Sequence, residues 1–208
     1  MEDKIISEKE SMLLIQQMIS TAKKEQTDSG IGWIVWGWLL FLASVFTYLN
    51  EKNEWVSSFF FWNLFGIAAI LLVVYETAKY FFGAKKEKVK TYTGDLFDRL
   101  NIGFGISLIL IIMSMNIGYP SIVPPVKGFT LLLGLYGFWI LIYGTVLNFK
   151  PSIIGAFITW GFAFAGLFVQ QGRFDITMLI HAAAVLCGYI IPGHIANVQF
   201  RKLKNKKF

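Results

Sequence analysis

The sequence predicts an all-α integral membrane protein with six transmembrane helices, preceded by a cytoplasmic amphipathic helix. Three observations support this fold class. Hydrophobic residues make up 55% of the 208 residues and charged residues only 15%, with a mean hydropathy of +0.57, whereas water-soluble domains are more polar. Six apolar segments are each long enough to cross the hydrocarbon layer of a bilayer. Lys and Arg residues are concentrated in alternate connections between these segments.

The N-terminal segment, residues 1–30, is expected to contain the amphipathic helix. Ser7 and Glu10 have the spacing of a capping box, in which each side chain satisfies a free backbone N–H of the first helical turn. Because residues 5–24 carry both acidic and basic side chains, we expect their apolar face to bind protein rather than lipid. The partner would be the chain's own bundle, a second copy in a homo-oligomer, or a cytoplasmic protein. The apolar face consists of Met12, Leu14, Ile15, Met18, Ile19 and Ala22.

Six spans are expected to follow within a membrane domain of residues 31–199. A stretch of about 20 apolar residues crosses a hydrocarbon layer of about 30 Å. The segments that meet this length are residues 31–49, 57–82, 100–119, 128–147, 152–169 and 176–198. Pro151 suits the first turn of the fifth helix, where its missing N–H costs no hydrogen bond. The chain then ends in a basic cytoplasmic tail, residues 200–208.

Small residues four positions apart recur within the spans and predict close packing between helices. The pairs are Gly103 with Ser107, Gly161 with Ala165, and Ala184 with Gly188. Aromatic patterns such as VWGWLLF and LYGFWILIYG also recur in the two halves of the chain. They leave open an inverted repeat of three helices, an arrangement found in many transporters.

The basic residues predict the orientation. If the N-terminus lies in the cytoplasm, sixteen of the nineteen Lys and Arg residues lie on that side, and only Lys52, Lys127 and Arg173 lie outside. Cytoplasmic loops of membrane proteins carry such an excess. We therefore expect both termini and the loop 83–99 in the cytoplasm, and the protein in the cell inner (plasma) membrane. The same distribution explains the net charge of +6, so no nucleic-acid partner is expected.

His181 is the most informative polar residue of the apolar segments. It lies about 9 Å inside the outer end of the last span, where a polar side chain needs a partner. Asn63 and Asn116 have a similar expected depth on two other spans, and Trp62 precedes Asn63. These four residues define a candidate outward-facing pocket; the alternative is hydrogen bonding between helices that only stabilises the bundle. His194, the other histidine, is about 20 Å away along the helix and cannot share a metal ion with His181.

Glu76 and Lys79 lie three residues apart near the cytoplasmic end of the second span and are expected to form an ion pair. A proton-coupled carboxylate at Glu76 is the alternative. The only cysteine, Cys187, is expected to be a small core residue. The motifs of zinc hydrolases, serine hydrolases and phosphate-binding loops are missing from the sequence. We therefore expect no enzymatic activity, no cofactor and no metal site.

The stretch ISEKESMLLIQQMISTAKKE and the start of the first span, GIGWIVWGWLL, resemble the opening of a family of small multi-span bacterial integral membrane proteins of unknown function. The resemblance covers about the first forty residues. It implies a multi-pass protein of a bacterial inner membrane, and it assigns no activity, cofactor or site residue.

Two functional hypotheses follow. The first is a non-enzymatic regulator, sensor or assembly factor that acts through its N-terminal cytoplasmic helix, because the apolar face of that helix needs a covering partner. The alternative is a small transporter or channel that uses the outward-facing polar pocket. The lipid bilayer is the partner common to both hypotheses, and the sequence leaves the oligomeric state open.

Overall fold

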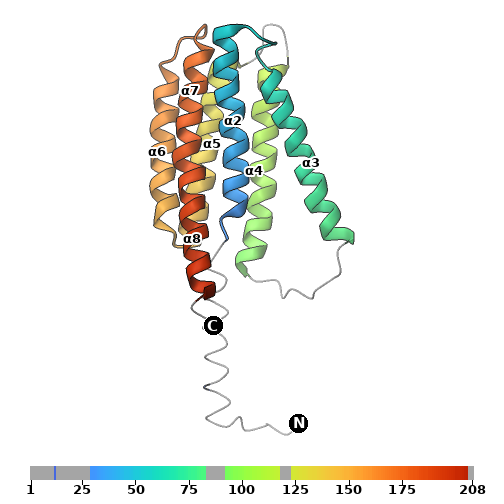
Figure 1. Cartoon of the computed structure of the whole chain (residues 1–208), viewed down its shortest axis with the longest axis vertical. Coiled ribbons are helices and arrows are strands. Elements are labelled where there is room, and N and C mark those ends of the chain that lie inside the picture. The colour runs from blue at the N-terminus through green and yellow to red at the C-terminus, as the bar shows by residue number, and fades with distance from the viewer. Residues whose placement is uncertain (1–11, 13–28, 83–91, 118–122, 206–208) are drawn as a thin grey trace.

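The computed structural model of the chain describes residue 12 and residues 29–82, 92–117 and 123–205. The secondary structure of these ranges is entirely helical (Figure 1). The elements are α2 (Ile31–Asn53), α3 (Phe60–Phe82), α4 (Tyr92–Asn116), α5 (Pro125–Val146), α6 (Lys150–Leu167), α7 (Phe174–Val185), η1 (Leu186–Ile190) and α8 (Ile191–Asn205).

Among the described residues, five helical segments are long and apolar enough to cross a membrane. They are Ile31–Asn53, Gly94–Asn116, Pro125–Val146, Lys150–Leu167 and Phe174–Asn205, the last of which runs through α7, η1 and α8. The apolar part of α3, Phe60–Tyr75, is shorter. The predicted all-helical class is therefore confirmed for the described residues, whose apolar helices are compatible with a membrane, and the number of six spans stays a prediction.

Several helices extend beyond the apolar segments that predicted them. α4 begins at Tyr92, within the expected loop 83–99, so the second half of that loop is helical instead. Arg99 Nη2 lies 3.1 Å from Asp95 Oδ2, one turn away, and such a pair stabilises an exposed helix. α8 likewise continues to Asn205, through most of the expected tail.

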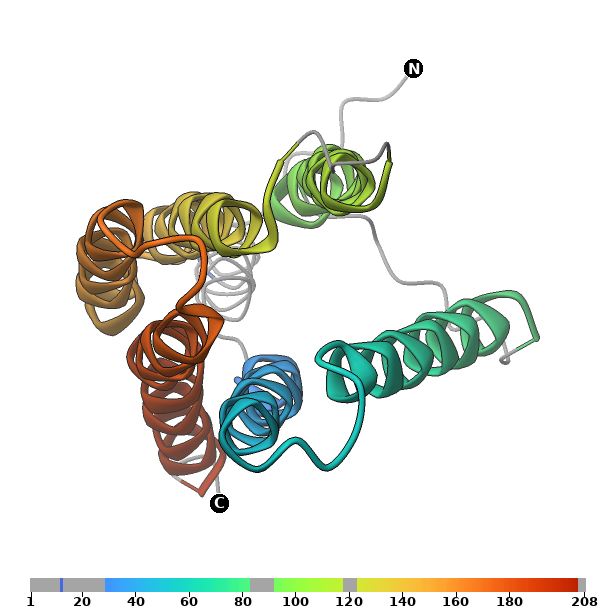
Figure 2. The same ribbon diagram turned by 90° about the horizontal axis from the view of Figure 1, so that it is seen from above.

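The core is built from α2, α5, α6 and the continuous α7–η1–α8 helix, which pack side by side (Figure 2). α5 and α6 form an antiparallel hairpin, and Pro151 lies in the first turn of α6, as predicted. Ile140 of α5 and Met178 of α7 are completely buried in this core.

α3 and α4 lie on the flanks of this core. α4 packs on α5, where the rings of Phe104 and Trp139 have centroids 5.2 Å apart. The first turn of α3 packs on α2, where the ring centroids of Phe61 and Phe46 are 5.4 Å apart. Farther along, α3 leans away from the core (Figure 1), and side chains such as Ile70 are exposed. Lipid tails are as apolar as these side chains, so their exposure is compatible with a bilayer.

Small residues bring α6 close to the α7–η1–α8 helix. A Cβ atom at Gly155 would lie 3.0 Å from the carbonyl oxygen of Cys187. One at Gly188 would lie 2.4 Å from Thr159 Oγ1. Ala184 is fully buried, so the predicted packing role of the Ala184 and Gly188 pair is confirmed.

The other two small-residue pairs do not form the predicted contacts within the described chain. No atom lies within 4 Å of the position that a Cβ would take at Gly103 or Gly161. Ala165 is exposed as well. These residues therefore lie on the faces of α4 and α6 that point away from the core, and their spacing indicates an outward-facing surface.

The π-helical turn η1 keeps the last span continuous across a proline. In η1 the N–H of Ile191 donates to the carbonyl of Leu186, five residues earlier. Pro192 follows, and its ring would clash with the carbonyl of Gly188 in a regular α-helix. A wider turn just before a proline relieves that clash. Phe174–Asn205 therefore runs as one helical segment.

Candidate functional site

His181 is the centre of the candidate site. It is completely buried on α7, and its Nδ1 lies 2.9 Å from the hydroxyl of Ser44 on α2. The Ser44 hydroxyl donates its single proton to the carbonyl of Leu40, 2.7 Å away. Ser44 must then accept from Nδ1–H, which assigns the tautomer. Nε2 is left with a lone pair, and it has no hydrogen-bond partner among the described residues.

Three aromatic rings enclose the imidazole. Their centroids lie 5.2 Å (Trp62), 5.6 Å (Phe129) and 5.8 Å (Tyr136) from that of His181, with steep interplanar angles of 72 to 88°. Trp62 comes from α3, and its indole N–H donates to the sulfur of Met178 at 3.2 Å. Phe129 and Tyr136 come from α5. Four helices therefore converge on one histidine.

Polar residues continue from His181 toward the N-terminal end of α7, between α2 and α7. Ser44, Thr47 and Glu51 follow at intervals of three and four residues, which places them on one face of α2. Thr177 lies one turn from His181 on α7. We call these five residues the α2–α7 seam. Thr47 is fully buried, and neither its hydroxyl oxygen nor Glu51 Oε1 has a hydrogen-bond partner in the described structure.

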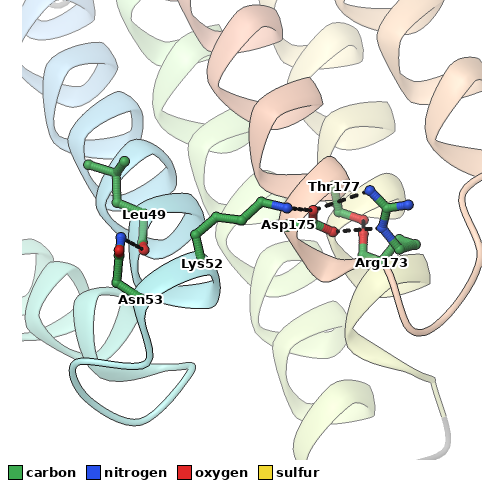
Figure 3. A network of polar contacts seen from close by, with 6 residues as sticks. All are labelled: Leu49, Lys52, Asn53, Arg173, Asp175 and Thr177. Carbon is green, nitrogen blue, oxygen red and sulfur yellow. Dashed lines mark hydrogen bonds and ion pairs between the residues drawn. The ribbon is translucent and has the colours of Figure 1, made fainter.

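An ion cluster ties α2 to α7 at the end of the seam near the start of α7 (Figure 3). Lys52 Nζ lies 2.9 Å from Asp175 Oδ2, and Arg173 Nε lies 3.1 Å from Asp175 Oδ1. The hydrogen bond to Asp175, together with its negative charge, raises the pKa of the Arg173 guanidinium above its usual value. Since Ser44 and Lys52 meet His181 and Asp175 respectively, the two helices are antiparallel and in contact over the whole seam.

Asn50 organises the connection that carries Trp62 toward the site. It is buried, and its amide nitrogen donates to the carbonyl of Val56 at 2.9 Å. In return, the Val56 N–H donates to Asn50 Oδ1 at 2.8 Å. This pair of bonds closes the loop between α2 and α3, and α3 enters the bundle with Trp62 two residues after its start.

The structure brings only part of the predicted pocket together. Trp62 reaches His181, as described above. Asn63 is exposed, because it follows Trp62 and is turned about 100° away on the same helix. Asn116 is exposed on α4, and its amide donates to the carbonyl of Ile112 in its own helix at 2.7 Å. The prediction grouped these two asparagines with His181 by their expected depth in the bilayer alone. In the structure, the rotation of α3 and α4 about their axes points both asparagines away from His181.

The remaining candidate residues either lie apart from His181 or fall outside the described residues. His194 is exposed on α8, whereas His181 is buried, so the two histidines have separate environments. The side chains of Glu76 and Lys79 lie outside the described residues, and their ion pair stays a prediction. On the N-terminal helix only Met12 is described, and it is exposed; the predicted face from Leu14 to Ala22 lies outside the described residues.

Sequence reasoning missed Ser44, Thr47, Asn50 and Glu51. Their signal was the run of polar residues spaced by three and four positions, Ser44, Thr47 and then Asn50 or Glu51, which begins in the second half of the predicted first span and continues just beyond it. Within the described ranges, no group of three His, Cys, Asp or Glu residues could hold a metal ion. Comparison with protein-family models, curated proteins and solved structures finds no match for this chain.

Proposed function

We propose that the protein is a non-enzymatic regulator, sensor or assembly factor of the bacterial inner membrane that works by contact with a second copy of itself. The supporting observation is the outward character of α4. No residue of α4 with a described side chain is fully buried, whereas half of the most apolar stretch of α5 is buried. α4 therefore has a free lateral surface beside a well-packed core.

The small residues of α4 make this surface suitable for a helix–helix contact. Gly103 has open space around its Cβ position, and the Ser107 hydroxyl is turned back to the Gly103 carbonyl at 2.9 Å. Association of helices in lipid depends on close packing, since lipid supplies no hydrophobic driving force, and small residues permit that packing. The N-terminal face from Met12 to Ala22 would add a cytoplasmic contact to the same assembly.

The proposal includes six spans with both termini in the cytoplasm. α3 has 23 residues, and at 1.5 Å per residue it is about 34 Å long, enough for a sixth span. Lys52 and Arg173 meet at Asp175, and Lys127 Nζ donates to the Leu167 carbonyl at the end of α6. The three basic residues Lys52, Lys127 and Arg173 therefore share one end of the bundle. The basic residues of α8 lie at the opposite end (Figure 1).

Cysteine cross-linking in native membranes tests the contact through α4. In a Cys187→Ala background, Ser107→Cys lies on the outward surface, and the matched control Leu108→Cys lies on the side that packs against the core. We expect an oxidant to produce a covalent dimer of Ser107→Cys and little or none of Leu108→Cys. Monomer in both variants, together with a monomeric mass in lipid nanodiscs, would contradict self-association.

The second candidate is a small transporter or channel with an outward-facing polar site. The α2–α7 seam favours it, because buried polar side chains within a membrane bundle commonly line substrate or ion pathways. A solute-dependent stabilisation of the wild type that disappears in His181→Ala would support this candidate.

A further inference from the structure

The α2–α7 seam contains three buried polar atoms that the protein itself leaves without a hydrogen bond. They are His181 Nε2, Thr47 Oγ1 and Glu51 Oε1. Thr47 and Glu51 share one face of α2 with Ser44, the partner of His181. Buried polar atoms are nearly always hydrogen-bonded, to protein or to water. Three such atoms at one contact between α2 and α7 point to water as their missing partner.

The two ends of the seam differ. Inward from Ser44, α2 contacts the last span through Leu40, which is 4% exposed, and Gly37. A Cβ at Gly37 would lie 2.8 Å from Ile190 Cγ1 and 3.0 Å from Tyr189 Cβ, so this end is tightly closed. Outward from Thr47, Glu51 is only partly buried, and the Lys52 side chain beside it is 50% exposed. The end of the seam at Glu51 is therefore the more exposed of the two.

We propose that the α2–α7 seam holds water and gives protons access from the outer surface to His181 Nε2. Water has two donors and two acceptor sites, so a short chain of molecules satisfies a carboxylate, a hydroxyl and an imidazole lone pair in succession. A proton from hydronium at Glu51 moves along these hydrogen bonds, leaves water behind, and forms an imidazolium at His181. Nδ1–H continues to donate to Ser44, so protonation breaks no existing bond.

Three aromatic rings surround the imidazole that would carry the charge, with centroids 5.2 Å (Trp62), 5.6 Å (Phe129) and 5.8 Å (Tyr136) from its own. The titratable and charged residues described around the seam are Glu51, Lys52, Arg173, Asp175 and Tyr136. The other groups around it are Ser44 and Thr47 from α2, Trp62 from α3, Phe129 from α5 and Thr177 from α7. Which end of the seam faces outside rests on the proposed orientation with both termini in the cytoplasm. Water entry itself is independent of self-association.

If no water reached His181, its imidazole would be expected in the other tautomer. If Nε2 carried the proton and pointed at an aromatic face, Nδ1 would have to accept from Ser44. The Ser44 hydroxyl would then give up the Leu40 carbonyl, which lies 2.7 Å away. The protonation state of Nε2 and its contact with water therefore decide between the two arrangements.

Nitrogen-15 NMR of histidine-labelled full-length protein in nanodiscs makes this measurement. The chain has two histidines, so His194→Gln leaves His181 as the only imidazole signal. At neutral pH we expect an unprotonated Nε2, magnetisation transfer from water to the ring, and conversion to imidazolium as the pH falls. A protonated Nε2 without water transfer would overturn the proposal.

Three variants locate the route. Thr47→Val and Glu51→Leu should each abolish most of the water transfer, and Thr47→Ser should retain it. Thr159→Val is the matched control, because Thr159 is equally buried but its hydroxyl donates to the Gly155 carbonyl. If Thr47→Val or Glu51→Leu keeps wild-type transfer while unfolding at the wild-type temperature, the proposed route is wrong. Cross-linking at Ser107 reports on self-association and is unaffected by water transfer to His181. Self-association and water access can therefore be refuted independently.

Discussion

At the scale of single residues, the Ser44 and His181 pair combines two kinds of hydrogen bond. Several buried hydroxyls of the core, Thr130 and Thr159 among them, donate to the carbonyl four residues earlier in their own helix. Ser44 makes that same local bond and also accepts from another helix. Its side chain therefore links α2 to α7 in addition to satisfying its own helix.

We predict that Ser44→Ala destabilises the protein by about 1 kcal/mol, because the Nδ1–H of His181 is left buried without an acceptor. Ser107→Ala is the matched control, since the Ser107 hydroxyl has only the local bond to Gly103 and its loss should cost less than about 0.5 kcal/mol. Thermal unfolding of both variants in the same detergent measures the difference. Equal effects would mean that the bond between helices contributes nothing.

At the scale of helices, the α5–α6 hairpin depends on glycine where the two backbones meet. A Cβ at Gly144 would lie 2.8 Å from the backbone nitrogen of Ile153, which cannot move independently of α6. Asn148 has a φ of 50° in the connection, a left-handed conformation that asparagine tolerates better than most residues. The Phe149 N–H donates to the Gly144 carbonyl at 2.7 Å and closes the end of α5.

Gly144→Ala should therefore destabilise the protein by about 1 to 3 kcal/mol through overpacking. Gly134 on the same helix has no atom within 4 Å of its Cβ position. Gly134→Ala should be neutral or stabilising by up to about 1 kcal/mol, because alanine is the better helix former. Unfolding curves of the two variants test the contrast, and a destabilised Gly134→Ala with an unaffected Gly144→Ala would refute this account of the hairpin.

The predicted N-terminal helix is the second element with a testable role. Ile15→Asp combined with Ile19→Asp would place two charges on the predicted apolar face, so we expect the oligomer to dissociate or the melting temperature to fall. Gln17→Asp with Ser20→Asp adds the same charge to the opposite face and should change neither. Mass photometry and thermal unfolding supply the readouts. If the first pair also leaves both unchanged, the N-terminal face has no protein contact to lose.

At the scale of the whole molecule, orientation follows from the distribution of charge. We predict a cytoplasmic signal from a reporter fused after Phe208 and an external signal from one inserted at Asn53, because basic residues are retained on the cytoplasmic side. Replacing Lys52, Lys127 and Arg173 with neutral residues should leave this topology unchanged, because it increases the excess of basic residues on the cytoplasmic side. An external C-terminal reporter in an otherwise intact protein would reverse the assignment.

The sequence by itself determined the class of the protein, the positions of its apolar helices and the charge asymmetry between their ends. A bilayer imposes length and composition on each span, and both are properties of a single segment. Helix ends were less accurate at α4 and α8, because a helix can continue beyond its apolar segment, and at α4 the pair of Asp95 with Arg99 stabilises the extension.

Only the tertiary structure decided which face of each helix points inward. In a membrane both the lipid-facing and the core-facing side chains are apolar, so the periodic contrast that orients a helix of a soluble protein is weak. Depth could therefore place Trp62 and Asn63 together at the level of His181, but rotation sends one into the core and the other outward. The same rotation hides Ser44 and Thr47 against α7 and leaves Gly103 facing outward, because contacts with neighbouring helices set the rotation of each span.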